Sequence, residues 1–272
     1  MTYLHILVLA LVQGVTEFLP VSSSGHLVLV PLLTTWPDQG LAMDVAVHIG
    51  TLLAVLLYFW RDLWSMIIGC WRFSKGRRDP GARLAVMVIL GTLPIIGAGV
   101  MLKDHMDGFR TLEVIGWTTL GFGLLLGLVD RLCMTVKRME HIGVLDTLII
   151  GLFQVLALIP GTSRSGITMT AARLLGFERS DSARFSMLLS IPTIVAAGTL
   201  VGLDLYEAGD WAVTESAGIA AALAFLSALI AIALMMAWLR TAGFGIFVVY
   251  RVILGTALLL IAYGILPLPT LI

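Results

Sequence analysis

Charged residues are scarce in this chain. They make up 12% of its 272 residues, whereas hydrophobic residues make up 59% and the mean hydropathy is +1.01. A soluble domain of this size carries about a quarter of its residues as charged ones. Most of the surface must therefore be solvated by lipid, and a soluble globular protein is excluded.

The sequence also lacks an excess of charge of one sign, a cysteine framework and a cleavable leader. Its 17 Lys and Arg residues balance 17 Asp and Glu residues, which removes the electrostatic basis for binding nucleic acid. Cys70 and Cys133 lie far apart in apolar surroundings, and we interpret both as small buried hydrophobic residues. The N-terminal apolar run follows no basic segment and leads into a Ser-rich turn, so we expect no signal peptide.

Long apolar stretches are what the chain does have. A helix needs about 20 apolar residues to cross a bilayer, and these stretches are continuous, without the alternation of barrel strands. We therefore predict an all-α polytopic membrane protein. The six predicted spans are residues 41–60, 84–102, 113–130, 182–204, 217–239 and 244–265.

Two further apolar regions, 3–33 and 145–175, are interrupted near their middles. Pro20 and Gly25 break the first, Pro160 and Gly161 break the second, and serines cluster at both breaks. Each remaining half is too short to cross a bilayer alone. Both regions therefore predict re-entrant helical hairpins.

Loop charges predict the orientation, because cytoplasmic loops are rich in Lys and Arg. Two loops are basic and are placed in the cytoplasm, and one is purely acidic and is placed outside. With re-entrant hairpins, both termini then lie outside the cytoplasm. The basic loops carry Arg72, Lys75, Arg77, Arg78 and Arg83, then Arg131, Lys137 and Arg138, and the acidic loop carries Asp204, Glu207, Asp210 and Glu215.

The two halves of the chain resemble each other. A shift of about 141 residues aligns Gln13 with Gln154, and Ser22, Ser24 and Gly25 with their counterparts in the second break. We interpret residues 1–272 as one integral membrane domain with repeat halves of about 1–130 and 145–265. Inverted repeats of this kind place a binding site near the middle of the membrane.

Ionisable residues inside a membrane are expensive and mark functional sites. Gln13 and Glu17 are four residues apart and share one helical face. Glu17 also fits an interfacial carboxylate, and His26 alone fits a structural imidazole. Beside a run of serines, we interpret Glu17 and His26 as catalytic candidates.

Both breaks place serine and glycine at the start of a new helix, where free backbone N–H groups favour anions. Arg164 adds a planar fork that suits phosphate oxygens, although Glu17 is its alternative partner. Two opposed helix starts and one arginine suit a ligand with two phosphates. The predicted substrate-binding residues are Gln13, Ser22, Ser24, Gly25, Gly161, Ser163, Ser165, Gly166 and Thr168.

Two other polar groups inside predicted spans have more ordinary interpretations. Asp44, His48 and Thr51 lie on one face of the first span, where they either line the site or pack helices through a polar cluster. Arg251 lies inside the last span, and we interpret it as a side chain that extends towards the cytoplasmic surface.

The motifs themselves carry a resemblance. Gln13-x-x-x-Glu17, residues 20–26 and residues 160–168 resemble the signature motifs of the bacterial undecaprenyl-diphosphate phosphatase family, linked to bacitracin resistance, and the similarity extends over nearly the whole chain. It implies hydrolysis of undecaprenyl diphosphate to undecaprenyl phosphate and phosphate in the bacterial plasma membrane, which recycles a lipid carrier for cell-wall synthesis. It also implies a divalent cation, Mg²⁺ or Ca²⁺, held by Glu17 and the diphosphate. The family pattern allows Gln at position 13.

The expected mechanism follows from this resemblance. Arg164 and the hairpin amides hold the terminal phosphate, and Ser23 attacks phosphorus. His26 accepts the serine proton or later activates water, while Glu17 orients His26 or holds metal. A rival route makes His26 the nucleophile, and the sequence leaves both open. A membrane transporter or flippase of a phosphorylated lipid or anion is the alternative function. A homodimer is also left open.

Overall fold

The computed structural model is helical throughout the residues that it describes, which are 2–34, 36, 40–102, 107–207 and 215–267. No strand forms within these ranges. They contain an isolated β-bridge between Lys137 and Phe177. The prediction of an all-α fold is confirmed.

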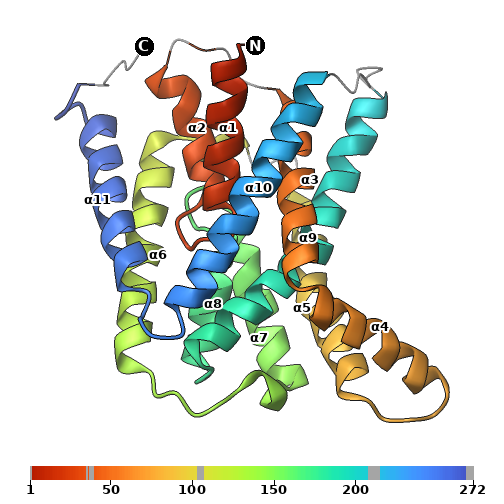
Figure 1. Ribbon diagram of the computed structural model, residues 1–272. Helices are drawn as coiled ribbons and strands as arrows, with labels where there is room; N and C mark the ends of the chain where they lie inside the picture. The colour runs from red at the N-terminus through yellow and green to blue at the C-terminus, as the bar shows by residue number, and fades with distance from the viewer. Residues whose placement is uncertain (1, 35, 37–39, 103–106, 208–214, 268–272) are drawn as a thin grey trace.

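Within the described ranges, six helices are long and apolar enough to cross a membrane. They form the bundle in Figure 1. Each lies within a few residues of a predicted span, because the apolar run fixes the helix length. The six are α3 (Leu41–Tyr58), α5 (Pro80–Leu102), α6 (Leu112–Leu132), α9 (Arg179–Glu207), α10 (Glu215–Trp238) and α11 (Gly245–Ala262).

The two interrupted regions form pairs of short helices. The first pair is α1 (Tyr3–Thr16) with α2 (Ser23–Leu33), and the second is α7 (Val144–Val155) with α8 (Arg164–Leu174). Figure 1 shows the pairs entering the bundle from opposite ends, so that their turns lie in its middle. Re-entry into a bilayer stays a prediction for both pairs, because the packing of helices does not fix the membrane boundaries.

Small residues position the first pair against the bundle. A Cβ added at Gly14 of α1 would lie 2.7 Å from the backbone oxygen of Ala224, and one added at Gly50 of α3 would lie 2.2 Å from that of Ala221. Contacts this short require glycine, because no side chain fits between the backbones. Helices α1 and α3 therefore both pack closely on α10.

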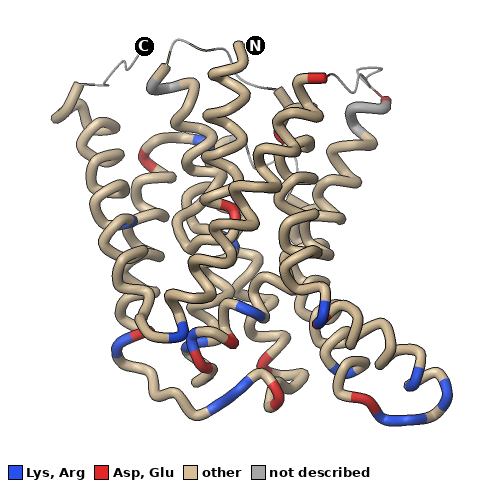
Figure 2. The backbone as a smooth tube through the Cα atoms, viewed as in Figure 1, with Lys and Arg blue, Asp and Glu red and all other residues tan. Residues whose placement is uncertain are grey.

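The charges are distributed as the loop count predicts. Figure 2 shows Lys and Arg gathered at the end of the bundle opposite the two termini. Of the acidic loop, Glu207 ends α9 and Glu215 begins α10, whereas Asp210 lies outside the described residues. Figure 1 shows α1 beginning and α11 finishing at the same end of the bundle.

One helix was not predicted. The segment expected to be a loop after the first span forms α4 (Trp60–Ser74), which packs on the start of α5 and extends away from the bundle (Figure 1). Cys70 lies on α4 and is exposed, and Cys133 is half-buried. The interpretation of both cysteines as buried residues is therefore wrong. Cys70 is exposed because α4 leaves most of its surface uncovered, and Cys133 directly follows the end of α6.

Candidate active site

The turns of the two helix pairs have the same local geometry. Ser22 and Ser163 precede α2 and α8, with φ angles of 77° and 70°, a left-handed conformation that is uncommon outside glycine. Each hydroxyl accepts the N–H of the glycine three residues later, at 3.3 Å for Gly25 and 3.2 Å for Gly166. The matching sequence motifs therefore fold into matching helix starts.

The two turns touch each other. The Ser165 hydroxyl donates to the backbone oxygen of Leu19 at 2.8 Å, which joins the second turn to the first. A Cβ added at Gly161 would lie 2.2 Å from the Thr118 hydroxyl of α6, so only glycine fits there. Residues about 140 positions apart in sequence thus lie in contact, which is the arrangement that the predicted site requires.

Glu17 is the centre of this site. Glu17 as a residue is 8% exposed. Its carboxylate accepts three hydrogen bonds, from Gln13 Nε2 at 3.0 Å, Ser23 Oγ at 2.7 Å and Arg164 Nη2 at 3.0 Å. A buried carboxylate is tolerated when it is paired and hydrogen-bonded in this way. The arrangement joins a carboxylate, a hydroxyl and a guanidinium from both turns.

Arg164 is held by the second half of the chain. Its Nη1 lies 3.4 Å from the backbone oxygen of Ser186 in α9. The Thr168 hydroxyl bonds both the Arg164 backbone oxygen, at 2.9 Å, and the Ser186 hydroxyl, at 2.7 Å. The fork is therefore fixed beside Glu17 before any ligand binds. Thr168 contacts Arg164 and Ser186, and its role in binding substrate stays a prediction.

The open side of the site is the part where Ser23 and His48, which both lie beside Glu17, are partly exposed, and Ser24 follows Ser23 in sequence. Ser23 is half-buried, Ser24 is exposed, and the His48 side chain is 37% exposed. His48 Nδ1 lies 2.7 Å from the Asp44 backbone oxygen, which directs Nε2 towards Glu17 Oε2 at 3.9 Å. Of the two interpretations of this face of α3, the structure supports a lining role for His48.

The His26 ring bonds other residues than Ser23 and Glu17, which were its expected partners. Its Nδ1 lies 2.6 Å from the backbone oxygen of Ser22, and its Nε2 bonds the hydroxyl of Tyr250 in α11. Neither ring nitrogen bonds Ser23 or Glu17, so Glu17 does not orient His26. The ring folds back over the start of α2 and lies parallel to the Tyr250 ring, at 10°. His26 therefore supports the left-handed turn at Ser22.

Arg251 is the residue that sequence reasoning missed. It is fully buried in α11 instead of extending to the cytoplasmic surface, so that interpretation is wrong. Its guanidinium donates only to backbone oxygens among the described residues, and these belong to both turns and to α6. The acceptors are Pro20, Thr118, Thr119, Gly161 and Thr162, at 3.0–3.4 Å.

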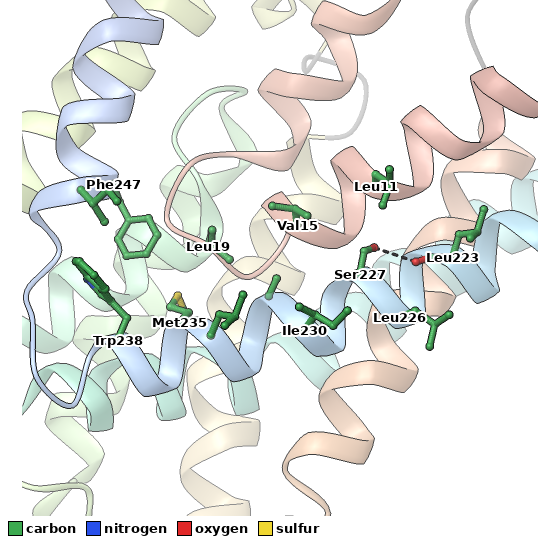
Figure 3. A pocket seen from close by; sticks show the side chains of 13 residues that line it. Leu11, Val15, Leu19, Leu223, Leu226, Ser227, Ile230, Met235, Trp238 and Phe247 are labelled. Atoms are coloured by element: carbon green, nitrogen blue, oxygen red, sulfur yellow. Dashed lines mark hydrogen bonds between the residues drawn. The ribbon is translucent and has the colours of Figure 1, made fainter.

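An apolar groove adjoins the first turn. It has a volume of about 600 Å³ and lies between α1, α10 and α11 (Figure 3). Leu19 lines it at the turn, and Trp238 and Phe247 line it towards the basic end of the bundle. Its walls are almost entirely aliphatic and aromatic carbon, so it suits a hydrocarbon chain.

Comparison with known proteins places the chain in a family. The sequence model of one protein family, described as bacitracin resistance protein BacA, matches residues 6–257 of this chain. Undecaprenyl-diphosphatase 1 of Rhodospirillum rubrum is 64% identical, over 97% of this chain and 96% of its own length. Undecaprenyl-diphosphatases of Roseobacter denitrificans and Hahella chejuensis are 52% and 49% identical, over 97% of this chain and 100% and 99% of their own lengths. The chain belongs to the bacitracin resistance protein BacA family.

Proposed function

We propose that this chain is an undecaprenyl-diphosphate phosphatase. It hydrolyses undecaprenyl diphosphate to undecaprenyl phosphate and inorganic phosphate, and so returns the lipid carrier to cell-wall synthesis. The observation that carries this proposal is the contact of Ser23 Oγ with a buried carboxylate, Glu17, that is also paired with Arg164. A nucleophile, a base and a phosphate-binding cation are the parts that phosphoryl transfer needs.

The first step forms a bond between Ser23 Oγ and the terminal phosphorus. Glu17 accepts the serine proton, because its Oε2 lies 2.7 Å from that hydroxyl. The bond between this phosphorus and the bridging oxygen breaks, and undecaprenyl phosphate leaves with the bonding electron pair. Arg164 and the first N–H groups of α2 and α8 stabilise the charge on the phosphoryl oxygens. Ser23 thus takes the role expected for it, with Glu17 in place of His26 as the base.

The second step hydrolyses the phosphoserine. His48 is placed to accept a proton from water, since its Nε2 faces the open side of the site near Glu17. Water attacks phosphorus, the bond between phosphorus and Ser23 Oγ breaks, and Ser23 Oγ takes back its proton from Glu17. Phosphate then leaves, and His48 gives the proton that it took from water to the solvent. His26 acts on neither proton and keeps the turn in place through Ser22.

The residues around Glu17 supply some, but not all, of the ligands that a divalent cation needs. Gln13 Oε1 is buried without a hydrogen-bond partner, and with the carboxylate of Glu17 it offers the oxygen ligands that Mg²⁺ and Ca²⁺ prefer. The described residues contain no group of three or more His, Cys, Asp or Glu that would hold a metal. Substrate oxygens would complete the ligand set. A bound cation would offset negative charge on the diphosphate.

The lipid part of the substrate and the location of the enzyme complete the proposal. The groove beside Leu19 receives a stretch of the polyprenyl chain, because it is apolar and adjoins the turn that carries Glu17 and Ser23. The protein spans the bacterial plasma membrane with its basic loops in the cytoplasm and its termini outside. Both helix pairs are re-entrant in this arrangement.

Purified protein in detergent is expected to release one phosphate from each molecule of undecaprenyl diphosphate and to leave undecaprenyl phosphate. Colorimetric phosphate assay and thin-layer chromatography of the lipid measure the two products. A transporter would bind the same lipid without cleaving it. Saturable binding with no phosphate release, with Mg²⁺ and with Ca²⁺, would therefore reject the phosphatase.

Arg251→Lys is expected to lower kcat for phosphate release at least about tenfold. A substitution far from the reacting atoms can cost more than this when it displaces the catalytic groups. A lysine keeps the charge, but its single ammonium cannot bond both turns at once. The KM should change less, because the hydrogen bonds of the Arg251 guanidinium go to backbone oxygens of the turns and of α6.

The control for this prediction is Arg240→Lys, at an exposed arginine after α10. Both variants are compared by thermal unfolding in detergent, so that a loss of fold is recognised. Full activity of a folded Arg251→Lys protein would remove the positioning role from Arg251.

A further inference from the structure

Helix α4 carries a stripe of large apolar side chains that nothing in the described chain covers. Trp60, Trp64, Ile67 and Trp71 are 55%, 58%, 61% and 59% exposed. At about 100° per residue, these positions fall within an arc of roughly 60° on the helix. The stripe follows directly on Leu57, which is exposed at the end of α3.

The opposite face of α4 is occupied by α5. A Cβ added at Gly69 would lie 2.4 Å from the backbone nitrogen of Ala82, and one added at Gly81 would lie 2.2 Å from the backbone oxygen of Ser65. The two helices are therefore in backbone contact along this side. Because Gly69 lies about 180° from Trp60 around the helix, the stripe points away from α5.

Basic residues surround the stripe. Lys75 Nζ lies 3.6 Å from the centroid of the Trp71 ring, and Arg77 and Arg78 are exposed at the tip of the arm. None of these three has an acidic partner among the described residues. The nearby carboxylates are already engaged, Asp79 with Arg72 at 3.1 Å and Asp62 with Arg184 of α9. The tip of α4 is therefore positively charged and free to bind anions (Figure 2).

We propose that α4 is an interfacial arm that binds anionic phospholipids. It lies along the membrane surface at the basic end of the bundle, with the tryptophan stripe among the lipid chains and the basic tip on lipid phosphates. Amphipathic helices with aromatic and basic residues bind anionic membranes in this way. The charge of the tip favours an anionic lipid over a zwitterionic one. This role is separate from the phosphatase reaction, because α4 contributes no residue to the site around Glu17.

Cys70 provides a probe at the arm itself. The chain has two cysteines, so Cys133→Ala leaves the exposed thiol of Cys70 on α4 for a fluorophore. The labelled protein is reconstituted into phosphatidylcholine vesicles that contain a small fraction of quencher-labelled phosphatidylglycerol or quencher-labelled phosphatidylcholine. The ratio of the two quenching efficiencies gives the relative association of the anionic lipid with α4.

The anionic lipid is expected to associate at least about fivefold more strongly, the contribution of one cation near an anionic surface. Arg77→Gln with Arg78→Gln should bring this preference close to unity. The control, Arg131→Gln with Arg240→Gln, removes the same charge from exposed positions at the same end and should retain it.

Several results would overturn the proposal. A wild-type preference near unity would reject anionic lipid as the partner. An equal loss of the preference in both double variants would assign anionic-lipid binding to the whole basic end of the bundle and not to α4. A preference that survives Arg77→Gln with Arg78→Gln would place the lipid elsewhere. Quenching by both lipids that falls as the protein-to-lipid ratio rises would show that a second copy of the chain covers the stripe.

Discussion

Arg164→Lys is expected to lower phosphate release from undecaprenyl diphosphate by at least about a hundredfold. Removing one donor that stabilises developing charge in a transition state costs about 10²–10³ in kcat. The guanidinium bonds Glu17 Oε1 at 3.0 Å and the Ser186 backbone oxygen at 3.4 Å, and so is held in one orientation. A lysine ammonium keeps the charge but cannot present two parallel donors to a phosphate from that position.

The control for Arg164→Lys is Arg138→Lys, at an exposed arginine that bonds Glu178 at 2.9 Å in the basic loop. It makes the same chemical change outside the site and should leave activity within about twofold. Thermal unfolding shows whether Arg164→Lys remains folded. If folded Arg164→Lys protein kept most of the wild-type kcat, a planar fork on the phosphate would not be part of the mechanism.

Ser23→Ala is expected to lower kcat by a factor on the order of 10³ or more, the scale of a lost serine nucleophile. Substrate binding should change little, because Arg164 and the helix starts remain. The measurements are phosphate release and binding of radiolabelled undecaprenyl diphosphate to protein in detergent. Loss of turnover with retained binding is the signature of a group that reacts with substrate instead of holding it.

Ser24→Ala is the matched control for Ser23. The two serines are neighbours at the start of α2, but only Ser23 bonds Glu17, while the exposed Ser24 hydroxyl lies 3.4 Å from Ser22 Oγ. We expect Ser24→Ala to lose less than about tenfold in kcat. The assignment of Ser23 would be reversed if Ser24→Ala were inactive and Ser23→Ala were active.

Much of the fold could be predicted from the sequence because membrane solvation makes length and apolarity decisive. The spans followed from apolar runs, and the breaks at Pro20 and Pro160 located both turns. The contact of Glu17 with Arg164 could also be predicted, because Glu17 was the alternative partner of the arginine in the second turn. Each of these features depends on residue type and spacing alone.

The features that were missed depend on three-dimensional packing. Among the residues that the structure describes, Arg251 bonds only backbone oxygens. Every residue carries a backbone oxygen, so no sequence pattern identifies these partners. The orientation of His26 is decided by Ser22 and by Tyr250, 224 positions away. The α4 stripe was visible at positions 60, 64, 67 and 71, but the basic residues that follow favoured a loop. Periodicity would have predicted the helix there.

Trapping the phosphoenzyme tests the central claim most directly. Undecaprenyl diphosphate labelled in its terminal phosphate is mixed with excess His48→Ala protein, in which hydrolysis of the intermediate should be slow, and the reaction is quenched in acid. We predict acid-stable label on Ser23, located by peptide mapping and absent from His48→Ala protein that also carries Ser23→Ala. Two results would contradict attack by Ser23. One is acid-labile label on His26, detected after an alkaline quench, and the other is turnover without any labelled protein.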